Sequence, residues 1–534
     1  MQELQNRSDA SAVSTDEPDV ADSRTRTQKI RSWFRTPLPY VLLAYLVFRG
    51  VILQKNGGIG AAMNYDDGVY YGAATGLANG LVPYRDFLLV HPPGIAVFFA
   101  PIAALGSVIT DLRALELARL VVILIGLLNT ALVYYVGKKA AGTTAAVTAS
   151  LLWIVWSALI FEEKTTLLEP FVLVGILVSL ALLFNTSERT WKPVVAGLVI
   201  GYAVVTKYWA AIPMLVIAGG VVVSRRVKAA VVYLVSAGVM ALVVTAPFWV
   251  LAGSQMVEDT IAAQSTRQVG SDGLLERLAL ILNISTASTW SKVGPRLGWP
   301  LVGACLVAVA LCAVAVWFRY RKGRIWVVLL VVQGAILLWV PVFFQGYASF
   351  VAPALLLTLG AGAQFLWDAG KSVAARRSLR VLAVAAVSLT VAYSIVLAAL
   401  TSFAFGSIGA GATPAVAAAR CVAADRPSTI AIVDKMTSNV TNGCPAVYDI
   451  TGLFFEPEVR ASGAKSRATS QGYQDAVLAL FAASDYVIIS RETADGLTPA
   501  SLAVLKSRPI VYTAKGGKLV IYGPPVTAPS PNGR

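Results

Sequence analysis

The amino-acid sequence predicts an all-α polytopic membrane protein of about eleven transmembrane helices, followed by a smaller α/β domain outside the cytoplasm. The 534-residue chain is 57% hydrophobic and only 14% charged, whereas soluble proteins carry about 25% charged residues. Its apolar residues form runs of roughly 15 to 24 residues between short polar patches, the pattern of polytopic helical proteins. After residue 404, short β-like and helix-like runs alternate instead.

The formal net charge of +15 would also suit a nucleic-acid-binding protein. The basic residues, however, form short clusters between apolar runs, which is typical of cytoplasmic loops that face anionic lipid. We therefore predict contact with membrane lipid and no binding of nucleic acid. The clusters lie at 138–139, 225–228, 319–324 and 376–380.

The N-terminal part predicts the orientation of the chain. Residues 1–28 are polar and aperiodic, so we expect a disordered cytoplasmic tail before a membrane module over 29–404. Basic residues precede the first apolar run, 38–54, and no small-residue cleavage site follows it, which favours an anchor over a signal peptide. The positive-inside rule then predicts a multi-pass plasma-membrane protein with a cytoplasmic N-terminus.

The first outer loop is predicted to be unusually long. The apolar run 94–109 contains Pro101 and is short for a span, which needs about 20 residues. If it crossed, Lys138 and Lys139 after the next run, 117–136, would face outside, so we predict that only the second run crosses. The loop then covers 55–115, and a connector of this length is typical of a functional segment.

Nine further spans and an outer domain complete the predicted topology. An odd number of spans places the domain, residues 405–523, outside the cytoplasm, before a Pro-rich disordered tail over 524–534. We expect spans at 142–160, 170–185, 193–206, 209–224, 229–252, 299–318, 325–344, 348–367 and 380–404. In the outer domain we expect strands at Thr429–Val433, Tyr486–Ser490, Ile510–Thr513 and Leu519–Tyr522, and helices at Thr413–Ala424, Gln471–Ala483 and Pro499–Ser507.

The two cysteines of the predicted outer domain leave two interpretations open. Cys421 and Cys444 form a disulfide if the domain lies in an oxidising compartment, and they are ordinary thiols otherwise.

Ionisable side chains collect on the predicted outer side of the membrane. Charges near lipid depth are costly, so they mark candidate functional sites. A carboxylate there could take a proton from a hydroxyl group, and cations could stabilise a phosphate leaving group. The candidates are Asp66, Asp67, Arg85 and His91 in the first loop, Glu162 and Glu169 in the second, Lys207 in the third, and Tyr347 at the outer end of a later span.

Three motifs resemble the GT-C superfamily of polyprenyl-phosphate-dependent glycosyltransferases. They are the Asp66-Asp67 pair with the downstream YRDFLLVHPPG, the Leu-Leu-Glu-Pro ending at Pro170, and the Thr-Lys-Tyr at 206–208. The superfamily includes the protein O-mannosyltransferases, the lipid A aminoarabinose transferases and bacterial arabinofuranosyltransferases. The resemblance extends over about 38–370 and is strongest at 64–94.

The resemblance implies roles for several residues. Asp66 or Asp67 matches the catalytic base after the first span, and we favour Asp66. Glu169 matches the family's second acid, and Lys207 its phosphate-binding lysine. Where the family often has a lysine before Pro-Pro, this chain has His91, so a role for His91 in catalysis is less expected than a structural one.

The implied reaction is an inverting transfer of a sugar from a polyprenyl-phosphate donor to an envelope glycan, lipid or protein on the outer face, in cell-envelope or cell-wall biogenesis. Lys207, Arg85 and Tyr347 would bind the donor phosphate. A divalent cation would fit the clustered carboxylates, but a monophosphate donor does not require one, so we predict no cofactor. The alternatives are a transporter or flippase of lipid-linked sugar and a non-catalytic envelope-binding protein.

Structural roles remain open for the same residues. Asp67 and Glu169 could begin helices as caps. Glu162 and Glu163 could be solvated loop charges, and Lys207 could extend toward lipid headgroups. Tyr70 and Tyr71 are interpreted as residues of the interfacial aromatic belt.

Overall fold

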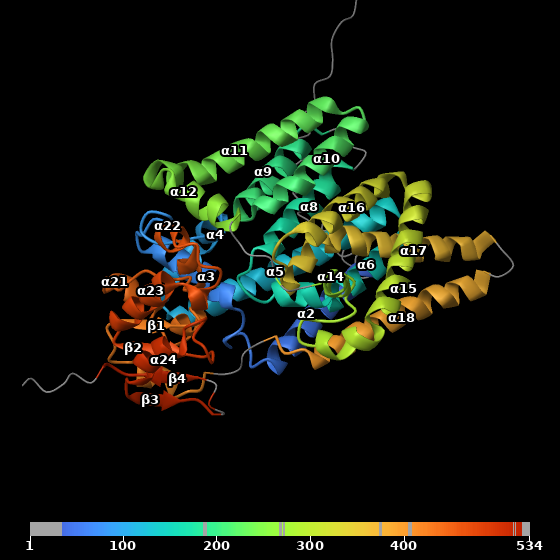
Figure 1. Cartoon of the computed structure of the whole chain (residues 1–534). Coiled ribbons are helices and arrows are strands. Elements are labelled where there is room, and N and C mark those ends of the chain that lie inside the picture. The colour runs from blue at the N-terminus through green and yellow to red at the C-terminus, as the bar shows by residue number, and fades with distance from the viewer. Residues whose placement is uncertain are drawn as a thin grey trace, which may run out of the picture.

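The computed structural model describes residues 35–184, 189–265, 270, 273–372, 376–403, 408–515, 517 and 519–525. Helices form one large bundle, and the C-terminal elements pack against one side of it, next to the short helices that follow the first span (Figure 1). The predicted N-terminal tail and nearly all of the predicted C-terminal tail lie outside the described residues.

Seven helical segments in the described part of the chain are long and apolar enough to cross a membrane. Four shorter apolar helices coincide with further predicted spans, so the predicted architecture of a helical membrane module is confirmed, while the count of eleven crossings stays a prediction. The long helices are α2 (Leu38–Lys55), α5 (Asp111–Ala140), α11 (Val227–Ala252), α15 (Trp290–Arg319), α16 (Arg324–Trp339), α17 (Ala352–Ser372) and α18 (Arg376–Leu400), and the shorter ones are α6 (Thr143–Val155), α8 (Glu169–Leu183), α9 (Trp191–Thr206) and α10 (Ala211–Val223).

The first loop folds into two short helices, α3 (Tyr65–Ala78) and α4 (Gly94–Ala103), which pack on each other. The ten residues of α4 span about 15 Å, half of the roughly 30 Å hydrocarbon core. With the η1 helix that follows it directly, α4 forms the apolar segment Gly94–Ser107, which is as long as some segments that are predicted to cross, so the absence of a crossing here stays a prediction. Other short helices connect the spans: η1 (Ala104–Ser107), α7 (Ser157–Glu162), η2 (Tyr208–Ala210), α12 (Gln255–Val257), η3 (Glu258–Ala262), α13 (Ala263–Ser265), α14 (Leu274–Ile281), η4 (Arg321–Gly323) and η5 (Gln345–Val351).

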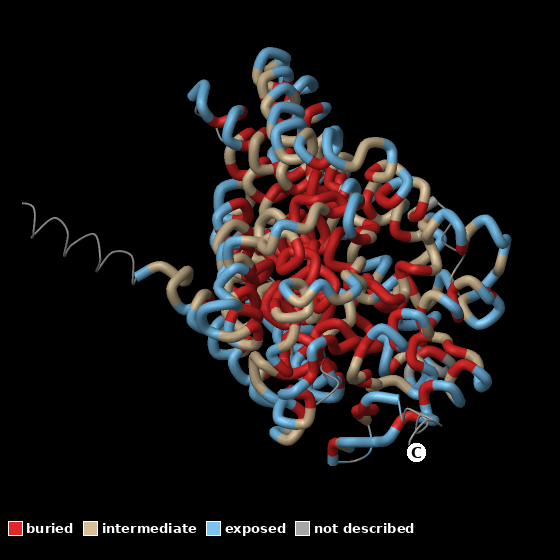
Figure 2. The backbone as a smooth tube through the Cα atoms, turned by 90° about the vertical axis from the view of Figure 1, so that its left-hand side faces the viewer, coloured by how far each residue is buried: buried red, intermediate tan, exposed pale blue. Residues whose placement is uncertain are grey.

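The bundle has a central helix and a lipid-facing rim. In the most apolar stretch of the segment Gln345–Ala369, which contains most of α17, 83% of the residues are buried, whereas the share is 11% in α15 and 17% in α11. Buried residues gather in the interior of the molecule (Figure 2). Outward apolar side chains such as Leu242 and Leu311 are 66% exposed. A contiguous apolar surface of this kind marks contact with lipid.

The C-terminal domain contains a four-stranded sheet with the order β1-β2-β4-β3. β1 (Val422–Ala424) runs parallel to β2 (Tyr486–Ile489), while β4 (Val520–Tyr522) runs antiparallel to both β2 and β3 (Ile510–Thr513). The helices are α19 (Ala412–Ala415), α20 (Ser428–Ile432), α21 (Met436–Thr441), η6 (Thr451–Phe455), α22 (Pro457–Ala461), η7 (Arg467–Thr469), α23 (Gln471–Ala482) and α24 (Pro499–Lys506). The predicted class, a small α/β region after the membrane module, is confirmed.

Two predicted elements of this domain are wrong. The run at Thr429–Val433 is mostly the helix α20, which begins after Pro427, and all five of its residues are buried. A short run that is buried on every side does not distinguish a strand from a helix. The predicted helix Thr413–Ala424 ends early, as α19, because its last residues pair with β2 as β1; tertiary pairing overrides local propensity.

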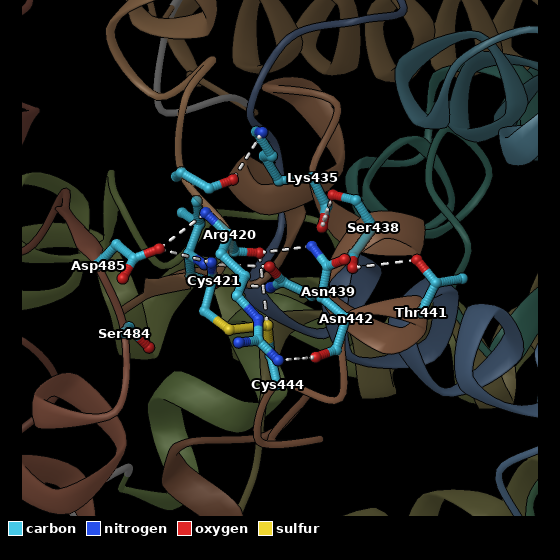
Figure 3. The surroundings of a disulfide bond; sticks show 12 residues. Arg420, Cys421, Lys435, Ser438, Asn439, Thr441, Asn442, Cys444, Ser484 and Asp485 are labelled. Carbon is cyan, nitrogen blue, oxygen red and sulfur yellow. Dashed lines mark hydrogen bonds between the residues drawn. A yellow bond between two sulfur atoms is a disulfide. The ribbon is translucent and has the colours of Figure 1, made fainter.

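The structure resolves the alternative for the cysteines. Cys421 and Cys444 form a disulfide that joins the start of β1 to the segment after α21 (Figure 3). The Asn439 side chain bonds both backbone groups of Val422, at 3.0 Å and 2.7 Å. The Asp485 carboxylate accepts from the backbone N–H of Cys421 at 3.1 Å. The disulfide and these bonds fix the edge of the sheet to α21.

Several specific contacts dock the domain on the first loop. The Tyr65 hydroxyl donates to Asp449 at 2.9 Å, and the Asp111 carboxylate accepts from the Thr437 N–H at 2.9 Å. At Gly68 an added Cβ would lie 2.0 Å from the Ser428 backbone nitrogen, so only glycine permits this approach of α3 to α20. These contacts hold the C-terminal domain over the start of α3.

Candidate active site

A cavity of about 550 Å³ lies where the ends of several membrane helices meet the C-terminal domain. Its lining comes from six separate parts of the chain: the start of α3, the segment after α3, the region from α7 to the start of α8, the residue before η2, the region of η5, and the C-terminal domain. The sequence candidates among the lining residues are Asp66, His91, Glu162, Glu169, Lys207 and Tyr347. The structure thus brings together six of the eight candidates.

The two adjacent aspartates have different surroundings. The N-cap of α3 is Asn64, whose side chain accepts from the Asp66 N–H at 3.0 Å, so the cap interpretation of Asp67 is wrong. Successive residues of a helix point about 100° apart. Asp66 lines the cavity, whereas Asp67 points into the protein.

Asp67 forms a buried ion pair with Arg119 of α5, and both side chains are 0% exposed. Its carboxylate also accepts from the N–H and the hydroxyl of Thr166, each at 2.9 Å. Three elements, α3, α5 and the α7–α8 connection, are joined by this one carboxylate. Asp67 therefore holds the cavity wall and does not line the cavity.

The pair Glu162 and Glu163 divides in the same way. Glu163 pairs with Arg49 of α2 at 2.7 Å and accepts from the Trp153 indole at 2.9 Å. Glu162 lines the cavity instead. Both are almost fully buried, at 2% and 0% exposed, so the interpretation as solvated loop charges is wrong.

Lys207 is held at the end of α9 by charge and by aromatic rings. Its ammonium pairs with the Glu169 carboxylate and lies 4.1 Å from the centre of the Tyr347 ring and 4.7 Å from that of Trp209. Such cation–π contacts stabilise a partly desolvated cation. At 7% exposed, Lys207 does not extend toward headgroups, so that interpretation is wrong. Glu169 lies in the first turn of α8 and is not its cap.

Glu162 is tightly packed beside this ion pair. Burial raises the pKa of the Glu162 carboxyl well above its usual range, and the neighbouring Glu169 carboxylate raises it further. At Gly346 an added Cβ would lie 1.7 Å from the Glu162 Oε1. The absence of a side chain at 346 is what admits Glu162.

His91 belongs to the wall formed by the first loop. Its ring lies edge-on to the Tyr70 ring at 5.4 Å between centroids, and its carbonyl accepts from the Tyr84 hydroxyl at 2.8 Å. Tyr70 and Tyr71 are 3% and 0% exposed, so they do not form an interfacial belt, and that interpretation is wrong.

Arg85 does not line the cavity, and its predicted contact with the donor phosphate stays a prediction. Its guanidinium pairs with the adjacent Asp86 at 2.8 Å, and its side chain is 47% exposed. The backbone at Tyr84 has φ +70°, and this turn directs the next residue toward solvent. Sequence proximity to the aspartates therefore does not carry Arg85 into the site.

The C-terminal domain supplies lining residues that the sequence did not indicate. The Arg491 guanidinium lies 4.7 Å from the centre of the Tyr65 ring. No local motif marks these positions, which lie more than 380 residues after α3 begins; only the docking contacts reveal them. They include Asp449, Thr451, Phe454, Lys465, Arg467 and Arg491.

Within the described residues, no group of three or more His, Cys, Asp or Glu side chains is arranged to hold a metal ion. The expected independence from a cofactor stays a prediction.

The chain matches known glycosyltransferases in sequence and in fold. Residues 89–341, a little less than half of the chain, match the model of Glycosyltransferase family 87. No curated protein matches the chain significantly.

Two solved structures share the fold. ArnT from Cupriavidus metallidurans in the apo state superposes with a TM-score of 0.55 and 15% identity, over 92% of this chain and 98% of ArnT. The oligosaccharyltransferase of Archaeoglobus fulgidus, in complex with Zn and sulfate, superposes with a TM-score of 0.53 and 12% identity, over 90% of this chain and 73% of that one. The expected resemblance is confirmed at this level: residues 89–341 match a glycosyltransferase family, and the chain has the same fold as ArnT and this oligosaccharyltransferase.

Proposed function

We propose that the chain transfers a sugar from a polyprenyl-phosphate donor to an envelope glycan, lipid or protein on the outer face of the plasma membrane. The observation that carries the proposal is the meeting of Asp66 with the Lys207–Glu169 pair in one cavity. A base for the acceptor hydroxyl and a cation for the leaving phosphate are the two groups that this reaction needs.

The proposed reaction is a single displacement. The Asp66 carboxylate takes the proton of the acceptor hydroxyl, whose oxygen attacks the anomeric carbon opposite the phosphate. The bond between that carbon and the phosphate oxygen breaks, and polyprenyl phosphate leaves with the electron pair. The anomeric configuration is inverted, and the proton remains on Asp66 until it passes to solvent.

The leaving phosphate would be bound at Lys207 and Tyr347. Lys207 offers a buried cation, and in a site shielded from water its charge acts more strongly on the phosphate than at the surface. Glu169 positions Lys207. Apolar side chains of the same cavity, Phe161, Val342 and Phe344, suit the first isoprene units of the lipid.

The disulfide supports the proposed orientation, because disulfides persist in oxidising compartments outside the cytoplasm. The orientation has its own test in cysteine labelling. A Lys139→Cys variant of a chain whose other cysteines are replaced should react with a membrane-impermeant maleimide only after the cells are opened. Labelling of intact cells would contradict the orientation.

The function is tested with the purified full-length chain and radiolabelled polyprenyl-phosphate sugars. We expect label to move from the donor lipid to an envelope acceptor, with the two separated by chromatography, in EDTA as well as without it. Movement of labelled lipid across vesicle membranes without sugar transfer would instead support the transporter alternative. A chain that binds envelope glycan but neither transfers sugar nor translocates lipid would support the non-catalytic one.

A further inference from the structure

A second, larger cavity, of about 1270 Å³, lies in the C-terminal domain. It is lined by the ends of β2, β3 and β4, by α24, and by residues 408–411. Ligand pockets of proteins usually measure about 300 to 1000 Å³, so this cavity has room for several sugar units. Nothing in the proposed transfer step uses it.

The two cavities meet at one residue. Arg491 lines both of them, and its guanidinium lies over the ring of Tyr65, which lines the catalytic cavity. On the first loop, Ala62 lines the second cavity while Asn64 and Asp66 line the first. The stretch 62–66 and the turn that carries Arg491 therefore belong to the wall between the two cavities.

The position of Arg491 is fixed from both sides. Its backbone N–H donates to the Asp425 carboxylate at 2.7 Å, and the Ser490 N–H donates to the same carboxylate at 2.9 Å. Its side chain pairs with Asp495. A turn held in this way keeps the guanidinium at the junction of the two cavities.

The lining of the second cavity is basic and carries groups that suit a saccharide. Four of its side chains are cationic and one, Glu492, is anionic. Tyr512 and Tyr522 are its aromatic lining residues. Thr429 and Ser490 carry hydroxyl groups, which donate to the Arg426 carbonyl and the Asp425 carboxylate and keep lone pairs that could accept from a sugar hydroxyl. The cations are Arg426, Arg491, Lys506 and Lys515, of which the two lysines are exposed.

We propose that the second cavity binds the acceptor, as a saccharide that carries phosphate or carboxylate groups, and presents its terminal hydroxyl to Asp66 past Arg491. This inference rests on the proposed transferase function. The charge balance favours an anionic ligand, because cations in a partly enclosed site attract anions most strongly. Because Arg491 lines both cavities, a saccharide bound in the second cavity would have only a short distance to extend to reach Asp66.

The test compares a Lys506→Gln/Lys515→Gln double variant of the full-length chain with the wild type. Both lysines lie away from the catalytic cavity, so hydrolysis of the labelled donor in the absence of acceptor should not change. With acceptor we expect the KM for acceptor to rise about tenfold at unchanged kcat, as for lost charge-assisted contacts. The matched control is Arg420→Gln, which removes one exposed cation of the same domain outside both cavities and should leave the KM unchanged.

Two acceptor preparations distinguish the source of the saccharide. One is an envelope glycolipid fraction extracted with organic solvent, and the other is the water-soluble envelope polysaccharide. Each is assayed before and after removal of phosphate and reduction of carboxyl groups. We expect the KM for one of the two to rise on this treatment, and to rise less in the double variant, which has already lost two of the four cations.

The outcomes separate the two proposals. An unchanged acceptor KM in the double variant, with normal transfer by the wild type, would overturn the acceptor site and leave the transferase standing. Full acceptor activity after the anionic groups are removed would overturn the anionic ligand. No turnover of any donor by the wild type would contradict the proposed function itself.

Discussion

The pairs Asp66–Asp67 and Glu162–Glu163 follow the same plan in two different loops. In each pair one carboxylate lines the cavity, and its neighbour is buried against an arginine of a membrane helix. The difference within each pair is one of direction: Asp66 and Asp67 are neighbours in α3, where successive residues point about 100° apart, and Glu163 follows Glu162 at the end of α7. We call Asp67 and Glu163 the inner acids and Asp66 and Glu162 the outer acids. Each inner acid holds together the cavity wall on which its neighbouring outer acid lies.

The two cavity-facing acids also differ from each other. Asp66 lies at the start of a helix, beside the C-terminal domain. Glu162 is packed against Gly346, and burial and the neighbouring Glu169 carboxylate raise the pKa of its carboxyl. A carboxyl accepts the hydroxyl proton only in its ionised form, so the raised pKa makes Glu162 less suited than Asp66 to the proposed role of base.

Apart from substitutions of the acids, the largest loss of activity is expected on substitution of Lys207, the cation that pairs with Glu169. Lys207→Met should lower kcat by about 10²- to 10³-fold, because it removes charge stabilisation of the leaving phosphate. Single-turnover transfer of labelled sugar measures this. As a control, Lys435→Met changes a lysine outside the cavity and should keep full activity. Wild-type turnover in Lys207→Met would remove Lys207 from the reaction.

Substitution of an inner acid should lower the stability of the fold and leave the rate of sugar transfer nearly unchanged. Asp67→Asn leaves the fully buried Arg119 without its counter-charge, which costs about 3 to 5 kcal/mol. We expect a clearly lowered unfolding midpoint in detergent, with transfer per folded molecule largely retained. Asp67→Asn/Arg119→Met should recover part of the loss. An unfolding midpoint of Asp67→Asn equal to that of the wild type would contradict the structural role assigned to Asp67.

The variant Glu162→Gln tests whether Glu162, unlike Asp66, is dispensable as an ionised carboxylate. Since glutamine resembles the protonated carboxyl, we expect transfer to fall by no more than about threefold. The raised pKa of Glu162 also predicts a pH effect. In the wild type its contribution to stability is complete below about pH 4.3, the unperturbed pKa, and is lost as the pH rises through the folded pKa. Unfolding measured from pH 4 to 9 should show a flatter profile for Glu162→Gln.

Arg85→Ala should have the smallest effect. Exposed ion pairs contribute about 0 to 1 kcal/mol, and the structure gives Arg85 a pair with Asp86 away from the cavity. We expect donor KM and kcat within about twofold of the wild type. A large rise in donor KM would show that the loop closes over the donor and would restore the role predicted from the sequence.

The sequence could predict the class of fold and the cavity acids because both depend on local signals. A long apolar run indicates a membrane span wherever it lies in the chain. Charged residues near lipid depth are rare, so they indicate a functional site. Asp66, Glu169 and Lys207 were found in this way and do line one cavity.

The sequence could not predict what depends on long-range packing. The direction of Arg85 follows from a left-handed turn at Tyr84, which is rare for a non-glycine residue. The part of the cavity lined by Asp449 and Arg491 depends on docking of a domain that begins some 340 residues after α3. Strand β1 forms because it pairs with β2, and no periodic pattern in the sequence indicates a strand there.

The most direct test of the account is sugar transfer by Asp66→Asn and Asp67→Asn, measured side by side on protein whose folded fraction is known. We predict that Asp66→Asn keeps the wild-type unfolding midpoint and loses about 10²- to 10⁴-fold in kcat. Asp67→Asn should show the reverse, a lowered midpoint with turnover per folded molecule close to the wild type. Transfer by folded Asp66→Asn within threefold of the wild type would contradict the assignment of Asp66 as the base.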